Sequence, residues 1–180
     1  MEDRPIWHTE FTQALTAEGT APYLCVLATV DGRMNPTARY MYCREVTEDV
    51  QLVFISDRRT RKDDHVRERP QAEVVFWLES SRTQFRLRGH TVVVDAEMDE
   101  HMRQTWWARI SDESRAINVG AGNGWTLSPD ASAKVSAETP MPSTFEILVL
   151  NPEEVELLAV KSQPHTKRVW NKAGAQWTTV

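Results

Sequence analysis

The chain has 180 residues, of which 41% are hydrophobic and 26% charged, proportions typical of a globular protein that folds as one domain over residues 1–180. Its net charge of −5 argues against nucleic-acid binding, which requires a basic surface. No apolar run reaches the roughly 20 residues that span a bilayer, and the charged residues at the start do not resemble a signal peptide. We therefore expect a cytoplasmic protein that binds neither nucleic acid nor membrane.

The first third of the chain is predicted to form one helix and three strands. Residues 5–18 place apolar side chains on one helical face. Runs rich in strand-forming residues follow, and Asp31-Gly32 between the first two is a strong signal for a hairpin turn. These predicted strands are residues 21–30, 34–46 and 50–56. Because Cys25 and Cys43 lie within them, we expect two buried free thiols, with a disulfide as the alternative.

The rest of the chain is predicted to add four strands and a second long helix. The strands are residues 72–79, 83–97, 144–150 and 153–160, the last two separated by Asn151-Pro152. A helix is expected at 96–111, a long loop at 120–143, and only a turn at Gly174 in the tail. Short turns between consecutive strands favour antiparallel pairing. The sequence therefore predicts a mostly β fold, a barrel with helices at its rim.

Residues 56–70 carry six basic side chains, which is unexpected in an acidic chain. A helix accounts for part of this charge, because Arg67 and Arg69 fall in its last turn, where the helix dipole favours cations. Thr60, followed three residues later by Asp63, predicts a capping box at the helix start. Four further cations lie at or before that start, where the dipole disfavours positive charge. They are Arg58, Arg59, Arg61 and Lys62.

These four cations lie where a predicted strand ends and a helix begins. Ser56 ends the strand, so a hydroxyl, guanidinium groups and free backbone amides meet there, an arrangement that suits a phosphate monoester. The alternative to a phosphate site is a surface turn whose cations face solvent.

Histidines and cysteines are scattered along the chain without the spacing of metal ligands, so no metal site is expected.

Three motifs taken together indicate a family. In order and spacing, "NPTARYMYCRE", "LVFISDRRTRK" and "RPQAEVVFWLESSRTQFRLRG" resemble the pyridoxamine 5′-phosphate oxidase-like family of FMN-binding split barrels, over about residues 20–95. The resemblance implies a split β-barrel of antiparallel strands with flanking helices, and FMN as the cofactor. It also implies a homodimer with FMN in a cleft at the subunit interface.

Carried over residue by residue, the resemblance assigns a set of residues to the cofactor. They are Arg39, Tyr40, Met41, Tyr42, Arg44, Ile55, Ser56, Thr60, Arg61, Lys62 and Gln84. Arg39 would lie near the phosphate, and Ser56 would bind a phosphate oxygen. Arg61 and Lys62 would be the paired phosphate cations. Gln84 would reach the flavin ring or the ribityl chain.

The chain departs from the family's pyridoxamine phosphate oxidases at their substrate site. Those enzymes carry Lys at the position of Arg44, and a C-terminal Arg-x-His-x-Arg segment that has no counterpart in "SQPHTKRVW". We therefore expect FMN to bind, and pyridoxamine phosphate to be oxidised poorly or not at all.

Three functions remain open at this point. The main hypothesis is an FMN-dependent oxidoreductase with a small-molecule substrate, because the flavin itself would carry the redox chemistry. No side chain in the sequence is identified as a catalytic acid or base. The alternatives are a flavin-binding carrier or stress-related protein without turnover, and the same barrel holding a deazaflavin or haem.

Overall fold

The computed structural model describes residues 4–120, 135–161 and 163–179, and within them the chain forms four helices and eight strands. The helices are α1 (Ile6–Glu18), α2 (Arg61–Glu68), α3 (Ala96–Arg109) and α4 (Asp112–Val119). The strands are β1 (Tyr23–Val30), β2 (Pro36–Val46), β3 (Leu52–Asp57), β4 (Gln71–Leu78), β5 (Thr83–Val94), β6 (Phe145–Ala159), β7 (Thr166–Asn171) and β8 (Trp177–Thr179). No helix in these ranges is both long and apolar enough to cross a membrane.

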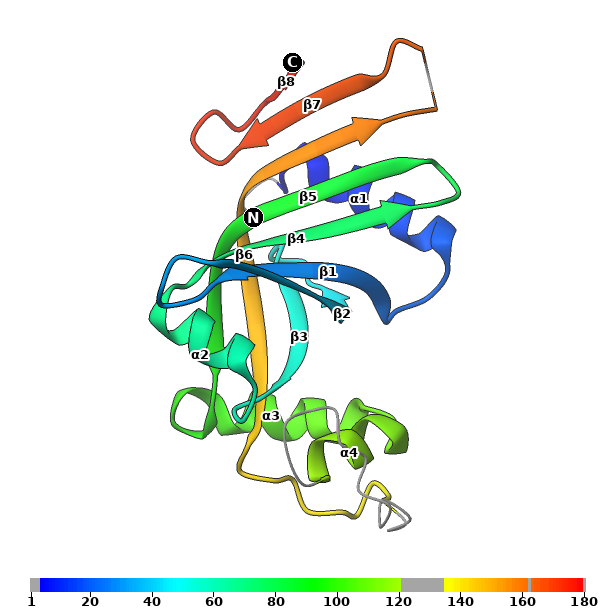
Figure 1. The fold of residues 1–180 in the computed structure, drawn as a ribbon. Helices are drawn as coiled ribbons and strands as arrows, with labels where there is room; N and C mark the ends of the chain where they lie inside the picture. Colours follow the sequence, from blue (N-terminus) through cyan, green and yellow to red (C-terminus); the bar gives the residue numbers. More distant parts are fainter. Residues whose placement is uncertain (1–3, 121–134, 162, 180) are drawn as a thin grey trace.

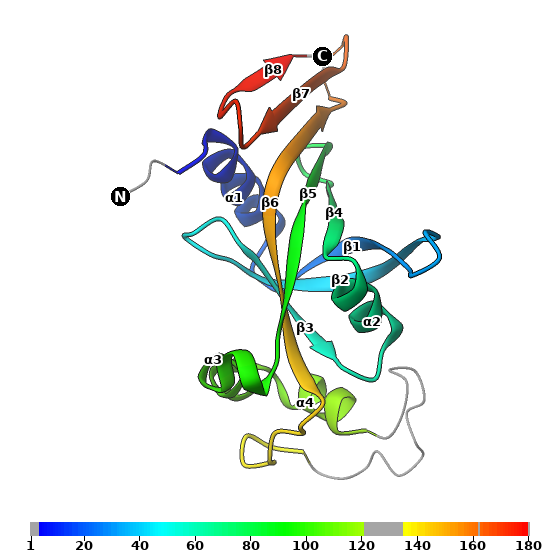
Figure 2. The same cartoon turned by 90° about the vertical axis from the view of Figure 1, so that its left-hand side faces the viewer.

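The strands form one antiparallel sheet that closes into a barrel. Their order is β3-β2-β1-β4-β5-β6-β7-β8, and β3 also pairs with β6. The first six strands therefore enclose a core, while β7 and β8 extend the sheet beyond it. Figures 1 and 2 show β5 and β6 running along most of the molecule, with α3 and α4 at one end and β7 and β8 at the other. The predicted mostly β split barrel with flanking helices is confirmed.

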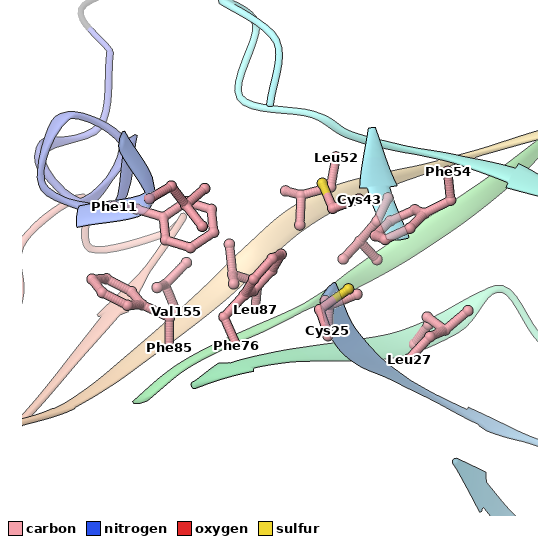
Figure 3. Close-up of a cluster of buried hydrophobic side chains, with 14 of the residues drawn as sticks. Phe11, Cys25, Leu27, Cys43, Leu52, Phe54, Phe76, Phe85, Leu87 and Val155 are labelled. Carbon is pink, nitrogen blue, oxygen red and sulfur yellow. The ribbon is translucent and has the colours of Figure 1, made fainter. Parts of the chain in front are cut away.

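Large apolar side chains from α1 and from the barrel strands fill the barrel (Figure 3). Trp7, Phe11 and Leu15 recur every four residues and therefore project from one face of α1 into this core. The Phe11 ring lies 5.0 Å from that of Phe76 and 4.9 Å from that of Phe85. These contacts fix the predicted N-terminal helix against the sheet.

The two cysteines are also part of this core. Cys25 on β1 and Cys43 on β2 are buried and unbonded to each other, as predicted. Burial raises the pKa of the Cys25 thiol to about 12, so this thiol is inert at neutral pH.

β6 contributes to two apolar clusters at once. Leu148 and Leu150 face the barrel interior, whereas Ile147 and Val149 pack with Trp106 and other residues of α3. A strand covered on both faces needs apolar side chains at every position, not at alternate ones. This explains the apolar run from Ile147 to Leu150, whereas Glu146, just before it, is a buried carboxyl group.

The predicted break between two strands at Asn151-Pro152 is wrong. β6 continues through both residues as one strand, and its pairing with β5 shifts register between Arg88 and Gly89, where Gly89 lies opposite Pro152. A Cβ at Gly89 would come within 1.9 Å of the Asn151 carbonyl oxygen. The proline is thus accommodated by an irregularity and a close backbone approach that only glycine permits.

Two further parts of the chain differ from the sequence prediction. The tail forms β7 and β8, with Trp170 opposite Trp177, where only a turn was expected. Helix α4 was not predicted, although the Ser111 hydroxyl accepts a hydrogen bond from the Ser114 amide and acidic residues follow in the first turn. Most of the predicted loop at 120–143 lies outside the described residues.

Candidate functional site

A pocket of about 660 Å³ lies at the end of β3, between β2, the start of α2 and α4. Ten of the eleven residues predicted to bind the cofactor line it: Arg39, Tyr40, Met41, Tyr42, Arg44, Ile55, Ser56, Thr60, Arg61 and Lys62. The remaining lining residues were not among them: Asp57, Arg59, Ser114, Ile117 and Asn118. The fold therefore brings together residues from three separate sequence segments, including α4, which lies beyond the end of β3 in Figures 1 and 2.

Lys62 lies deepest among the cations at the helix end of the pocket. Its ammonium group donates a 2.7 Å hydrogen bond to the Thr60 hydroxyl, and in the described chain no carboxylate forms an ion pair with it. Burial lowers the pKa of Lys62 to about 8. A buried ammonium group without a counter-ion is costly, so this end of the pocket favours an anion.

Arg39 supplies a second cation held only by neutral groups. Its guanidinium donates to the Leu27 carbonyl at 3.1 Å and to the hydroxyls of Thr29 and Thr37 at 2.8 and 2.6 Å. Burial lowers its pKa. His65 closes this cluster, with Nδ1 3.2 Å from each threonine hydroxyl. The side chain is fixed while its charge remains uncompensated.

Arg44 lies toward α4 in the same pocket. One of its terminal nitrogens donates to the Ser114 hydroxyl at 3.1 Å, and its Nε is buried without a hydrogen-bond partner. Its guanidinium carbon lies 5.8 Å from the centre of the Tyr42 ring, and burial lowers its pKa. An unsatisfied buried donor is a position where a ligand acceptor would gain a hydrogen bond.

The four unexplained cations of the basic segment prove to have different roles. Arg61 is exposed at the mouth of the pocket, and Lys62 lies inside it. Arg59 pairs with Asp57 and donates to the carbonyls of Asn118 and Gly120 at 3.0 Å each, so it caps the C-terminal end of α4. Arg58 lies mostly in solvent.

The predicted capping box at Thr60 and Asp63 is wrong. Neither side chain caps the helix: the Thr60 hydroxyl donates to the Asp57 carbonyl at 2.7 Å, and Asp63 is fully buried. Asp63 instead accepts a 3.0 Å hydrogen bond from Arg67. Arg67 thus has a specific ion-pair role, not only the dipole interaction inferred from the sequence.

Gln84 lies outside this pocket. It sits on β5 opposite Trp77 of β4, on the outer face of the sheet. That face also carries Leu24 and Tyr42, which are paired across β1 and β2. Their side chains and that of Tyr40 are exposed, Tyr40 by 75%. We call Leu24, Tyr40, Tyr42 and Trp77 the outer apolar patch; its two tyrosines also line the pocket.

Comparison with known proteins identifies the family of the chain. The family model for the pyridoxamine 5′-phosphate oxidase FMN-binding domain matches residues 4–95, just over half of the chain. The chain belongs to this family. The match spans α1 to the end of β5 and includes the ten predicted residues that line the pocket, but not α4.

Relatives within the family are named as oxidases. The chain is 26% identical over 178 residues to the pyridoxine/pyridoxamine 5′-phosphate oxidase of Cyanothece sp. (strain PCC 7425 / ATCC 29141), covering 95% of this chain and 83% of that protein. It is 31% identical over 112 residues to the enzyme of the same name from Thermosynechococcus vestitus (strain NIES-2133 / IAM M-273 / BP-1), covering 59% and 53%.

Solved structures share the fold over almost the whole chain. A pyridoxamine 5′-phosphate oxidase-related, FMN-binding protein from Nostoc punctiforme PCC 73102 aligns with a TM-score of 0.83 and 23% identity, covering 99% of this chain and 97% of that one. PhzG from Burkholderia lata 383, solved with tetrahydrophenazine-1-carboxylic acid, aligns with a TM-score of 0.79 and 18% identity, covering 99% and 93%. These likenesses extend the shared fold beyond residue 95.

Proposed function

We propose that the chain is an FMN-binding oxidoreductase that acts on a small molecule. One observation carries this proposal: Arg39, Arg44 and Lys62 are all partly buried in one pocket, and none has a carboxylate partner in the described chain. Uncompensated buried cations are costly unless an anion binds. The FMN phosphate, a dianion above pH 7, supplies that charge.

The residues present fit such a cofactor. The phosphate would lie at the helix end of the pocket, where Lys62 and Arg61 provide charge and Ser56 provides a hydroxyl. Backbone amides at the start of α2, those of Arg61 and Lys62, would add donors for the same anion. When bound, the flavin supplies the electron transfer, and the chain's own residues bind it, orient it and exclude water.

We further propose a homodimer in which the partner subunit covers the pocket and the outer apolar patch. Tyr40 and Tyr42 are exposed although they line the pocket, so a single chain leaves its mouth open. Covering apolar and aromatic surface drives association. In such a dimer Gln84 would meet a flavin bound by the partner subunit, which accounts for its position outside the pocket of its own chain.

The substrate is proposed to differ from pyridoxamine phosphate. Binding that amine requires cations for a second phosphate, and the C-terminal segment offers few. Lys167 pairs with Glu156 at 2.8 Å, and Arg168 pairs with Glu10 and stacks 4.7 Å from the Trp177 ring. Both cations are therefore already engaged within the chain.

Absorbance and mass spectrometry of the purified protein test the proposal. A flavin spectrum and the mass of FMN are expected, followed by bleaching with NAD(P)H and recovery with an acceptor. A bound flavin that is never reduced would instead favour a carrier or stress-related protein. Detection of the mass of a deazaflavin or haem would show that this ligand is bound in place of FMN. Failure of the apoprotein to bind added FMN would refute the proposed cofactor.

A further inference from the structure

Two buried carboxyl groups lie next to Ser56, a residue that lines the pocket. Asp63 of α2 and Glu146 of β6 are 0% and 1% exposed. Both accept hydrogen bonds from the Arg67 guanidinium, Asp63 at 3.0 Å and Glu146 at 2.8 Å, so the two groups are close neighbours. Acidic side chains are rarely buried without matching cations.

The surrounding charges do not compensate this pair fully. Arg67 of α2 donates to Asp63 at 3.0 Å and to Glu146 Oε1 at 2.8 Å, but it also lies 3.3 Å from Asp95, which caps α3. Arg58, after β3, is 3.9 Å from Glu146 Oε1 and mostly exposed. Two cations, one of them distant, thus form ion pairs with three carboxylates among the described residues.

One atom of the cluster has no partner among the described residues. Glu146 Oε2 is buried and accepts no hydrogen bond. A proton on this oxygen would give it a donor role toward Asp63 and remove one buried charge. Burial, followed by the interaction with Asp63, raises the pKa of Glu146 to about 7. The geometry and the charge balance therefore both favour a shared proton near neutral pH.

The carboxyl pair is connected to the pocket by short contacts. Glu146 is the strand partner of Ser56, which lines the pocket, and the Ser56 hydroxyl lies 3.4 Å from Asp63 Oδ1. Lys62 feels the charges of both Asp63 and Glu146. Negative charge on the pair therefore supports Lys62 while the pocket is empty, and repels an anion that enters it.

We propose that Asp63 and Glu146 form a proton-binding site coupled to the pocket, so that the protein takes up a proton when a phosphate-bearing ligand binds. The inference rests on the proposed function, because the phosphate of FMN is the ligand concerned. Binding and protonation then favour each other: FMN affinity rises as pH falls through neutrality, and proton affinity rises when FMN is bound.

The test compares wild-type protein with Glu146→Gln, which imitates the protonated form in shape and charge. FMN affinity is measured by fluorescence between pH 6.5 and 8.5, where the FMN phosphate stays mostly dianionic. Proton uptake is measured by calorimetry in two buffers of different ionisation enthalpy. Glu154→Gln is the matched control, since Glu154 lies on the same strand but pairs with Arg88 at the surface.

Between pH 6.5 and 8.5, the loss of FMN affinity is expected to be about fivefold larger in wild type and in the control than in Glu146→Gln. Wild type and the control should also take up more protons than Glu146→Gln when FMN binds near pH 7.5. A one-unit rise in the Glu146 pKa on binding corresponds to a tenfold limit. Lys62 also titrates near pH 8, and its pKa depends on the charge of Glu146. The comparison is therefore repeated in the Lys62→Met background, where the effect of Glu146→Gln on the pH dependence should persist.

Equal pH dependence and equal proton uptake in wild type and Glu146→Gln would overturn the inference while leaving FMN binding intact. No FMN binding by wild type at any pH would instead refute the proposed function and the inference with it. Should Glu146→Gln not fold, infrared spectra of the wild type decide: a protonated-carboxyl band must gain intensity when FMN is added at pH 7.5. An unchanged band would count against the shared proton.

Discussion

Replacing Lys62 by Met is expected to stabilise the protein without FMN and to weaken its binding of FMN. Burial lowers the pKa of Lys62 from 10.5 to about 8, and at 1.36 kcal/mol per unit this is about 3 kcal/mol of unfavourable charge burial. Partial solvent exposure of the side chain reduces the gain to about 1–2 kcal/mol. Because the folded-state pKa is lowered, the cost is fully present below pH 8 and disappears as pH rises toward 10.5.

Urea unfolding at pH 7 and at pH 10 measures this effect, and titration with FMN measures binding. The Met variant should unfold at higher urea than wild type at pH 7, with a smaller difference at pH 10. Loss of the charge-assisted bond should weaken FMN binding at least tenfold. Arg61→Met is the matched control, because Arg61 lines the same pocket but is exposed: it should weaken FMN binding without stabilising the free protein. A Lys62→Met protein that is less stable than wild type, or that binds FMN equally well, would refute the reasoning.

Arg67→Ala is expected to lower the free energy of unfolding by about 3 kcal/mol, because it leaves the buried carboxylates without their main cation. Arg69→Ala, in the same turn, should change the free energy of unfolding little. Equal urea midpoints for the two variants would contradict this role of Arg67. Glu146→Gln should raise the free energy of unfolding by up to about 3 kcal/mol at pH 8 and leave it unchanged at pH 4.5. Because the pKa of Glu146 is raised in the folded state, the stabilising contribution of wild-type Glu146 is full below pH 4.5 and is lost as pH rises through 7. A stability gain that does not vary with pH would contradict the assignment. Light scattering should give twice the 20.6 kDa chain mass, and Leu24→Asp in the outer apolar patch should reduce the measured mass to that of one chain. A monomeric wild-type protein at micromolar concentration would refute the proposed dimer. FMN-loaded protein incubated with pyridoxamine phosphate under air should form pyridoxal phosphate far more slowly than about 1 per second, and turnover at that rate would show that other residues build the second phosphate site.

The sequence predicted the barrel well because its strands carry local signals. The Asp31-Gly32 turn, the run of strand-forming residues in β1 and the alternating apolar residues at the start of β5 each specify an element without reference to the rest of the chain. The failures occur where tertiary contacts decide. β6 passes through Pro152 because Gly89 on the neighbouring strand permits the close approach, and no local pattern in β6 reveals that partner.

The pocket residues likewise divide into those that local sequence motifs predicted and those that only tertiary contacts bring in. Ten of its residues were predicted because family motifs preserve their order along β2, β3 and α2. The α4 residues Ser114, Ile117 and Asn118 were missed, since α4 lies outside those motifs and is held at the pocket by contacts with residues far away in the sequence, Arg44 and Arg59. A helix-start signal at Ser111 was present, but it indicated only that a helix exists, not what it faces.

Helix α2 shows why charge alone does not reveal a role. Lys62 and Arg67 are both cations on this helix, and dipole arguments rank Lys62 as the anomaly and Arg67 as ordinary. In the folded chain Lys62 is partly buried and forms no ion pair with a carboxylate of the described residues, whereas Arg67 forms ion pairs with the two buried carboxylates Asp63 and Glu146. We therefore expect anion binding and proton binding to involve neighbouring faces of one short helix. Because Asp63 lies next to Lys62 in sequence and against Glu146 in space, neither face can change its charge without altering the other.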